Sequence, residues 1–205
     1  MIAPHPDDES IGAWALMAHL RSRGTMIRVL VVTDGAASHP GSRLWPRARL
    51  IRERQRETRR AMRIIGIGAG DVAFLGLPDG ALPNAAVLAR RRVGRAVTCA
   101  PRPLLLIAPE VGDDHADHRA TARAAAQTRG AGIRRLAYPV WPAGRNLRGA
   151  RALILTGRQR LAKRQAIRSY RTQAGRITDD PSGFAMSRAQ IAAFSRAREM
   201  FVECR

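Results

Sequence analysis

IRVLVVTDG, residues 27–35, is a short run of apolar and mostly β-branched side chains that ends in a turn. A run that is apolar at successive positions is typical of a strand buried on both faces of a parallel sheet. A helix is expected before it, over residues 10–23, because apolar side chains recur there at helical spacing. Gly24 follows in the position just past a helix end. The stretch therefore predicts a buried parallel strand preceded by a helix.

The alternation of strands and helices continues along the chain. Further strands are expected at residues 72–75, 104–108 and 135–140, and helices at 48–65, 85–97, 119–129, 158–171 and 188–197. This order predicts an α/β fold, doubly wound, with a mostly parallel sheet and helices on both faces, in a single domain over residues 1–205. The first strand is the exception, because only Met1-Ile2-Ala3 precedes the first polar motif, so it is predicted to be truncated.

Composition limits the partners. The formal net charge is +20, yet Lys163 is the only lysine and the arginines are scattered through every predicted helix. A nucleic-acid surface would instead gather basic residues in one tract with interleaved aromatics, so no obligate nucleic-acid partner is predicted. No apolar run approaches the ~18 residues of a membrane span, and the start lacks the basic and apolar regions of a signal peptide. No transmembrane segment is expected, and a cytoplasmic location follows. Two cysteines make no disulfide framework.

Polar clusters stand at the ends of four predicted strands. They are His5, Asp7 and Asp8 after the first, Asp34 after the second, Asp79 after the third, and His115, Asp117 and His118 after the fourth. In an open α/β sheet, ligands bind beyond the carboxyl ends of the strands. We therefore expect these side chains to meet in one site.

The residue types indicate a metal site. Two histidines and one carboxylate form a three-ligand zinc site with a fourth position open for water, which titrates near pH 7 when bound. A second carboxylate can serve as general base, and a further histidine can stabilise an oxyanion. This set predicts metal-assisted hydrolysis of an amide or ester. Taken alone, the acids that follow Pro6 have a second interpretation, since Asp and Glu also favour the first turn of a helix.

Two motifs carry a family resemblance. His5-Pro6-Asp7-Asp8-Glu9 together with His115-Ala116-Asp117-His118 resembles the paired signature of the LmbE-like, PIG-L-type N-acetylglucosaminyl deacetylase family. Thr33-Asp34-Gly35 and the stretch 74–80 resemble turns of the same family. The resemblance implies a Rossmann-like fold and a zinc-dependent hydrolase with one Zn²⁺ per chain.

The resemblance also implies a role for each residue of the two motifs. By motif position, the metal ligands would be His5, Asp8 and His118. Asp7 would be the general base, His115 would stabilise the oxyanion, and Asp117 would orient His115. Arg54 and Asp79 would lie near the sugar, and Glu9 keeps its interpretation as a helix-start acid.

The predicted function is removal of an acetyl or other acyl group from an N-acylated amino sugar or sugar conjugate. One alternative is a metal amidase that acts on a non-sugar acylated amine. The other is a basic protein that binds nucleic acid or a membrane surface on an inactive scaffold. Residues 110–112 lack the aromatic often found before the second motif in sugar-thiol pathway members, so the sequence leaves the natural substrate open. It also leaves open whether the chain forms a homo-oligomer.

Overall fold

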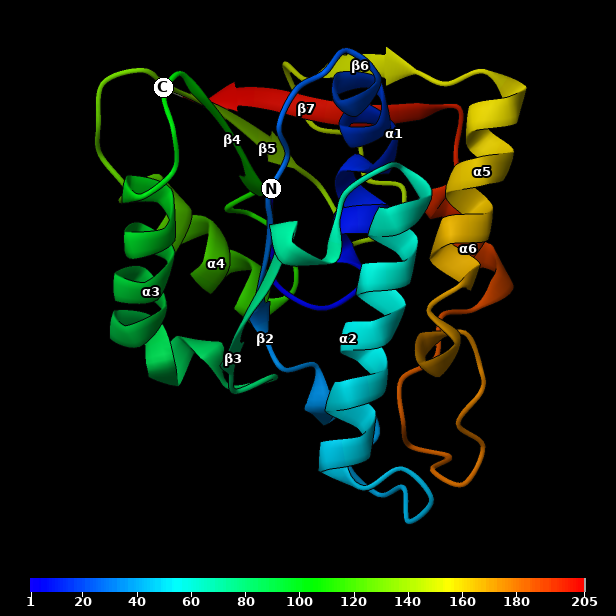
Figure 1. Cartoon of the computed structure of the whole chain (residues 1–205). Helices are drawn as coiled ribbons and strands as arrows, with labels where there is room; N and C mark the ends of the chain where they lie inside the picture. The colour runs from blue at the N-terminus through cyan, green and yellow to red at the C-terminus, as the bar shows by residue number, and fades with distance from the viewer. Residues whose placement is uncertain (205) are drawn as a thin grey trace.

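The computed structural model describes residues 1–204 as an alternation of strands and helices (Figure 1). The strands are β1 (Ile2–Ala3), β2 (Val29–Thr33), β3 (Val72–Leu77), β4 (Leu104–Pro109), β5 (Ile133–Tyr138), β6 (Arg151–Ile154) and β7 (Arg198–Cys204). The helices are α1 (Asp8–Ser22), α2 (Arg47–Ile64), α3 (Ala86–Thr98), α4 (Ala116–Ala126), α5 (Gly157–Arg168) and α6 (Arg188–Phe194). Short 3₁₀ turns lie at Ala36–Ser38, Ala69–Asp71, Leu82–Ala85 and Arg171–Gln173.

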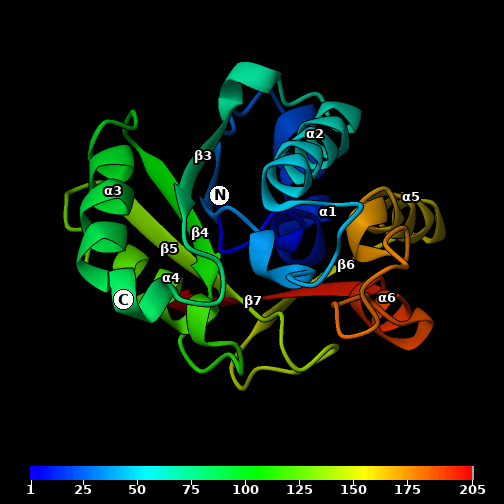
Figure 2. The same ribbon diagram turned by 90° about the horizontal axis from the view of Figure 1, so that it is seen from below.

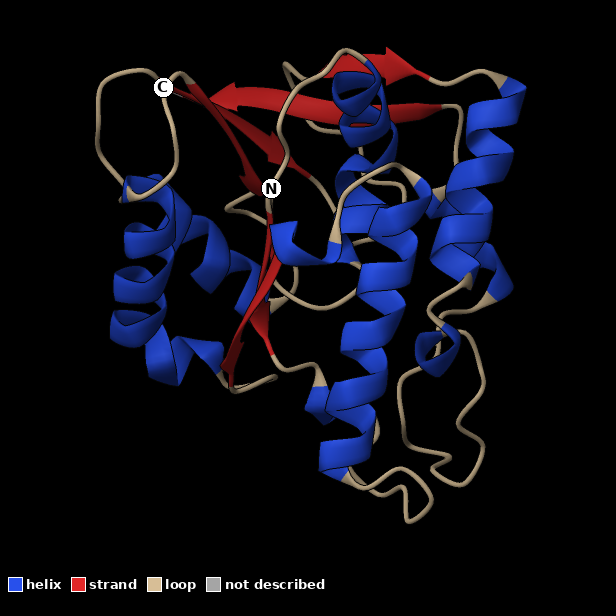
Figure 3. Cartoon of the chain, in the orientation of Figure 1, coloured by secondary structure: helices blue, strands red, loops and turns tan. Residues whose placement is uncertain are grey.

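The strands form two adjoining sheets (Figure 3). The first has the parallel order β1-β2-β3, and the second has the order β4-β5-β7-β6, in which β4 and β5 are parallel and β7 runs antiparallel to both of its neighbours. β1 lies against β4, where the two sheets meet. The predicted α/β, mostly parallel fold is confirmed, and the first strand is two residues long, as expected.

Helices cover both faces of the strands (Figure 2). One buried cluster joins α1, α2 and α5 to β2, with Trp14, Met62 and Tyr170 among its members. A second cluster packs α3 and α4 on the opposite face, through Val93 and Ala125. The two clusters are the physical basis of the doubly wound architecture, because each sheet face is apolar and has to be covered.

The sequence pattern did not predict the two strands near the carboxyl end. β6 and β7 pair antiparallel with each other, and residues 188–197, predicted as one helix, divide into α6 and the beginning of the turn before β7. β6 is short and mostly exposed, so it lacks the continuous apolar run that marks a buried strand. Among the described residues, no helix is both long and apolar enough to cross a membrane.

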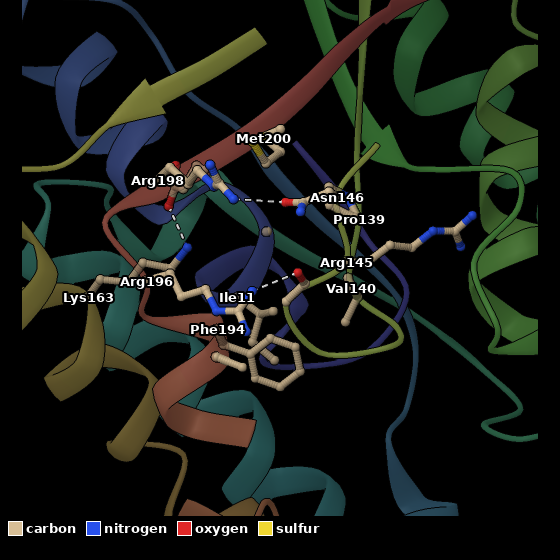
Figure 4. Close-up of a pocket in the computed structure, with 14 residues that line it drawn as sticks. Ile11, Pro139, Val140, Arg145, Asn146, Lys163, Phe194, Arg196, Arg198 and Met200 are labelled. Atoms are coloured by element: carbon tan, nitrogen blue, oxygen red, sulfur yellow. Dashed lines mark hydrogen bonds and ion pairs between the residues drawn. The ribbon is translucent and has the colours of Figure 1, made fainter. Parts of the chain in front are cut away.

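α1 is bent just after the first motif. Ala13 has non-helical angles (φ −144°, ψ 23°), and the amides of Ala15 and Leu16 donate to the carboxylate of Glu199 at 2.8 and 2.9 Å. Lys163 reaches from α5 toward β7 and forms a 2.8 Å ion pair with Glu199 (Figure 4). Both side chains are buried, so β7 and α5 together hold the second half of the helix that carries Asp8.

Tyr138 passes directly beneath the bend. Its hydroxyl donates to the carbonyl oxygen of Ile2 at 2.9 Å, which fixes the short strand β1. A Cβ added at Gly12 would lie 2.1 Å from Cδ2 of the Tyr138 ring. Only glycine allows this approach.

Gly12→Ala is therefore expected to lower the free energy of unfolding by about 1–3 kcal/mol, because the ring or the helix has to shift. Gly94→Ala is the matched control: it lies within α3, and nothing lies within 4 Å of its added Cβ. Helix propensity predicts that this control is neutral or stabilising by up to ~1 kcal/mol. Urea unfolding of both variants gives the comparison, and equal effects would contradict the assigned Tyr138 contact.

Candidate metal and active site

Three predicted ligands converge where β1 and β4 end. His5 Nδ1 lies 3.1 Å from Asp8 Oδ2 and 3.1 Å from His118 Nε2, and His118 Nε2 lies 3.2 Å from Asp8 Oδ2. Zinc bonds of about 2.0–2.1 Å in tetrahedral geometry require donor atoms about 3.3 Å apart. The three donors therefore form a triangle of the size of one face of a zinc tetrahedron.

Carboxylates hold the other nitrogen of each of these rings. Asp79 Oδ1 and Asp117 Oδ2 lie 3.1 and 3.3 Å from His5 Nε2. Asp113 Oδ1 lies 3.2 Å from His118 Nδ1, a contact at ion-pair distance whose angle departs from hydrogen-bond geometry. A carboxylate behind a ligating imidazole fixes the ring and raises its basicity.

Asp113 is a residue that sequence reasoning missed. Its Oδ1 accepts the amide of His115, and its Oδ2 accepts the amides of Val140 and Trp141. Its position two residues before His115 was the available signal, since an Asp that accepts the amide two residues on forms an Asx turn. Although burial disfavours a charged ring, Asp8 and Asp113 raise the pKa of His118 to about 9. This negative surrounding also favours a bound cation.

The predicted partner of Asp117 was wrong. Its carboxylate accepts the amides of Gly80 and Leu82 at 2.7 and 3.0 Å and faces the ring of His5. The reason is helical geometry: α4 begins at residue 116, and Asp117 in its first turn points back toward the loop after β3. Asp117 therefore supports His5, while its backbone amide, not its carboxylate, meets His115.

His115 precedes α4 and caps it. Its Nδ1 accepts the amide of Asp117 at 3.2 Å, so the neutral ring carries its proton on Nε2. Burial, together with the nearby rings of His5 and His118, lowers the pKa of His115. The ring lines the cleft beside the ligand triangle, its centroid 4.7 Å from that of His5. The residue is thus a neutral N–H donor at the site.

Asp7 has a strained backbone that is held on both sides. Its φ of 137° is the only positive value of a non-glycine residue in the described chain, and such strain gathers at functional sites. Its amide donates to Glu9 Oε2 at 3.1 Å, and its carbonyl accepts the amide of Ser10 at 2.9 Å. Burial, opposed by the charge of Arg54, raises the pKa of Asp7 to about 8. A carboxylate with a pKa near neutrality suits a general base.

Glu9 and Arg54 brace this loop. Glu9 is fully buried and accepts the hydroxyl of Tyr170, and burial raises its pKa to about 7. Arg54 comes from α2 and is 2% exposed; its guanidinium donates to the carbonyls of Gly35 and Pro6 at 2.7 and 2.8 Å. Arg54 lines the cleft, and its Nη2 also lies 3.4 Å from Asp7 Oδ2, so Arg54 supports Asp7. Its predicted place near the sugar stays a prediction.

The site opens into a cleft of about 560 Å³. His5, Asp7, Asp8, Arg54, Asp79 and His115 line it, whereas Asp117 and His118 lie behind. Asp79 also accepts the amide of Ala37 at 2.8 Å, which ties the loop after β3 to the loop after β2. The structure thus gathers the predicted site residues, with Asp34 set apart in an ion pair with Arg47.

Comparison with solved structures shows the same fold in several enzymes. N,N'-diacetylchitobiose deacetylase from Pyrococcus horikoshii is similar at a TM-score of 0.74, with 20% identity over 99% of this chain and 82% of that chain. The zinc-inhibited form of teicoplanin deacetylase Orf2 is similar at 0.63, with 19% identity over 84% and 83%. GalB, the 4-carboxy-2-hydroxymuconate hydratase from Pseudomonas putida KT2440, is similar at 0.68, with 16% identity over 95% and 81%. At these identities the likeness establishes the fold alone.

Comparison of the sequence with family models identifies the family of this chain. A comparison with curated proteins found no match. The family model for PIG-L, the GlcNAc-PI de-N-acetylases, matches residues 1–128, which hold both the His5–Glu9 motif and the His115–His118 motif. This match spans more than half of the chain and includes His5, Asp8 and His118, so the chain belongs to the PIG-L family.

Proposed function

We propose that this protein is a zinc-dependent hydrolase that removes an acyl group, acetyl in the first instance, from an N-acylated amino sugar or sugar conjugate. The observation that carries the proposal is the triangle of His5, Asp8 and His118, with Asp7 and His115 beside it in one cleft. The PIG-L family match and the deacetylases of the same fold support it. GalB shows that the fold also serves a hydratase, so the argument rests on the residues of the site.

The residues fit zinc by donor type as well as by spacing. Two imidazole nitrogens and one carboxylate oxygen are the donors of many catalytic zinc sites. Each ligating ring has a carboxylate behind it, as such sites require. When bound, zinc lowers the pKa of water and polarises the substrate carbonyl.

The protein groups divide the proton chemistry. Asp7 accepts the proton of the attacking water and delivers it to the leaving nitrogen, since its carboxylate lines the cleft directly beside Asp8. His115 donates its Nε2–H to the oxygen that becomes negative during attack. Arg54 and Glu9 hold Asp7 in place, and the carboxylate of Asp79 at the wall of the cleft can accept a hydrogen bond from a sugar hydroxyl.

Metal analysis combined with an amine-release assay tests the proposal. The purified protein should contain about one zinc per chain and release primary amine from N-acetylated sugars. N-acetylated amines without a sugar serve as the comparison, and faster turnover of these would favour the amidase alternative. Binding to DNA should disappear at physiological salt, because it would reflect net charge alone. A protein that neither binds zinc nor releases amine after zinc addition would refute the proposal.

Asp113→Asn tests the support behind the metal. The substitution removes the negative charge that faces His118 Nδ1, so zinc affinity should fall by about 10–100-fold. Asp114→Asn is the neighbouring control. Asp114 is exposed, and the described residues show no ion pair between its carboxylate and either imidazole of the triangle. Competition with a zinc chelator measures both. Equal affinities for the two variants would show that Asp113 does not support the metal.

A further inference from the structure

One wall of the cleft is apolar and comes from segments far from the catalytic motifs. Trp141, Phe184 and Met186 form it, with Ile11 beside the metal ligands. Phe184 is 38% exposed, and its ring meets that of Trp141 edge-on at 6.0 Å between centroids. Trp141 in turn meets Phe194 edge-on at 5.2 Å. Trp141 is partly exposed, whereas Met186 and Ile11 are buried, each 6% exposed, so the two aromatic rings form the accessible part of this wall. Aromatic side chains that line a cleft next to a polar centre are typical of a ligand-binding wall.

Backbone hydrogen bonds hold this wall in place. The amide of Phe184 donates to the carbonyl of Ser38 at 2.7 Å, and the amide of Met186 donates to the carbonyl of Gln173 at 2.7 Å. Upstream, Asp180 accepts the amide of Gly41 at 2.8 Å. The segment that carries Phe184 is thus tied to the loop after β2. Because the wall is ordered before a ligand binds, less conformational entropy is lost on binding and the affinity is higher.

The charges of the cleft differ from those of the whole protein. Four carboxylates line it, those of Asp7, Asp8, Asp79 and Asp114. Among the lining residues Arg54 is the only arginine or lysine, and its guanidinium is occupied by the carbonyls of Gly35 and Pro6. Despite a net charge of +20, the lining therefore offers no free arginine or lysine to pair with a phosphate or carboxylate substituent.

The wall also lies outside the part of the chain that the family model matches. That match ends at residue 128, whereas Trp141, Phe184 and Met186 follow it. The family match therefore covers the reaction centre and does not extend to the three residues of the wall. The cleft, at about 560 Å³, has the size of pockets that take ligands larger than one sugar ring.

We infer that the substrate carries an uncharged apolar group of about phenyl size next to the scissile amide, and that this group packs on Trp141, Phe184 and Met186. This inference rests on the proposed function, because it places the scissile amide at the His5, Asp8 and His118 centre. The group belongs either to the acyl part or to a substituent on the sugar. The two positions are chemically alike and separable by experiment.

Competing substrates test the inference on the zinc-loaded protein. Values of kcat/KM are measured for N-acetylglucosamine, for N-benzoylglucosamine and for phenyl N-acetyl-β-glucosaminide. Burial of one phenyl ring should raise kcat/KM on the order of tenfold for at least one of the two phenyl compounds, and the better one identifies the position of the group. N-acetylglucosamine 1-phosphate should gain nothing over N-acetylglucosamine. A preference for the phosphate, or no gain with either phenyl compound, overturns the inference.

Two variants test whether the higher kcat/KM of the phenyl compounds comes from the wall. Phe184→Ala should reduce the ratio of phenyl to unsubstituted kcat/KM by about three- to tenfold. Leu161→Ala, which removes a 58% exposed apolar side chain of α5 that does not line the cleft, should leave that ratio unchanged. A ratio that Phe184→Ala does not move would overturn the assignment of the wall.

Binding without turnover separates this inference from the proposed function. The phenyl compounds and N-acetylglucosamine are titrated calorimetrically into zinc-loaded Asp7→Asn protein. At least one phenyl compound should bind on the order of tenfold more tightly than N-acetylglucosamine. Tight phenyl binding without any amine release by the unaltered protein would refute the proposed reaction while supporting the wall. Amine release by the unaltered protein, with equal binding of all three compounds, would support the proposed reaction and refute the wall.

Discussion

Asp7→Asn is expected to lower kcat by about 10²–10⁴-fold while the protein keeps its zinc, because general-base catalysis contributes about that much. Asparagine matches aspartate in size and tolerates a positive φ better than most residues, so the strained loop should persist. It cannot accept a proton from water near neutral pH. The measurement is amine release together with zinc content of the same preparation.

His118→Ala should instead lose the metal, since one donor of the triangle disappears and its imidazole is fully buried. Comparison of the two variants separates proton transfer from metal binding. His19→Ala, on an exposed part of α1, serves as the histidine control and should retain both zinc and activity. If Asp7→Asn kept full kcat, Asp7 would not be the base. If His118→Ala kept stoichiometric zinc, the ligand assignment would be wrong.

Glu199→Ala is expected to destabilise the protein by about 3–5 kcal/mol, the usual cost of leaving one member of a buried ion pair without its partner. Three groups lose their acceptor at once: the ammonium of Lys163 and the amides of Ala15 and Leu16. The loss falls on the bend of α1, directly after the motif that carries Asp7 and Asp8. Urea unfolding measures the change, with the midpoint and slope fitted together.

Glu203→Ala is the matched control on the same strand. Its ion pair with Arg134 joins two exposed side chains, so its removal should leave the unfolding midpoint unchanged. The double variant Lys163→Met with Glu199→Ala should recover part of the stability, because it leaves no unpaired buried charge. A Glu199→Ala protein as stable as the Glu203→Ala protein would contradict the role given to the buried pair.

Much of the fold and the centre of the site could be predicted from the sequence, for identifiable reasons. Buried parallel strands such as β2 have a continuous apolar run, and polar residues after the strands converge because parallel carboxyl ends meet at one edge. His5, Asp8 and His118 therefore came together as expected. Their roles, including that of His115, remain predictions for the experiments above.

What the sequence missed depends on contacts between distant segments. The partner of Asp117 was wrong because the first turn of α4, whose start was expected at residue 119, sets where that carboxylate points. Asp113 escaped notice because its function lies in contacts with His118 and with the amides after β5. Glu199 and Lys163 are 36 residues apart, and no local pattern indicates that they meet beneath α1. Side-chain partners of this kind are set by tertiary packing.

The proposed metal site lies at the junction of the two sheets, so a bound metal would also affect the stability of the fold. His5 and Asp8 follow β1 of the parallel sheet, whereas His118 follows β4 of the mixed sheet, and the described strands form no hydrogen-bonded ladder between β1 and β4. A cation bound by all three side chains would link the two sheets at a place where no backbone hydrogen bonds join them. Ligand binding to the native state adds stability by mass action. Metal loading should therefore slow amide exchange on both sides of the junction, and the proposed zinc ion would then stabilise the contact between the two sheets as well as the reaction.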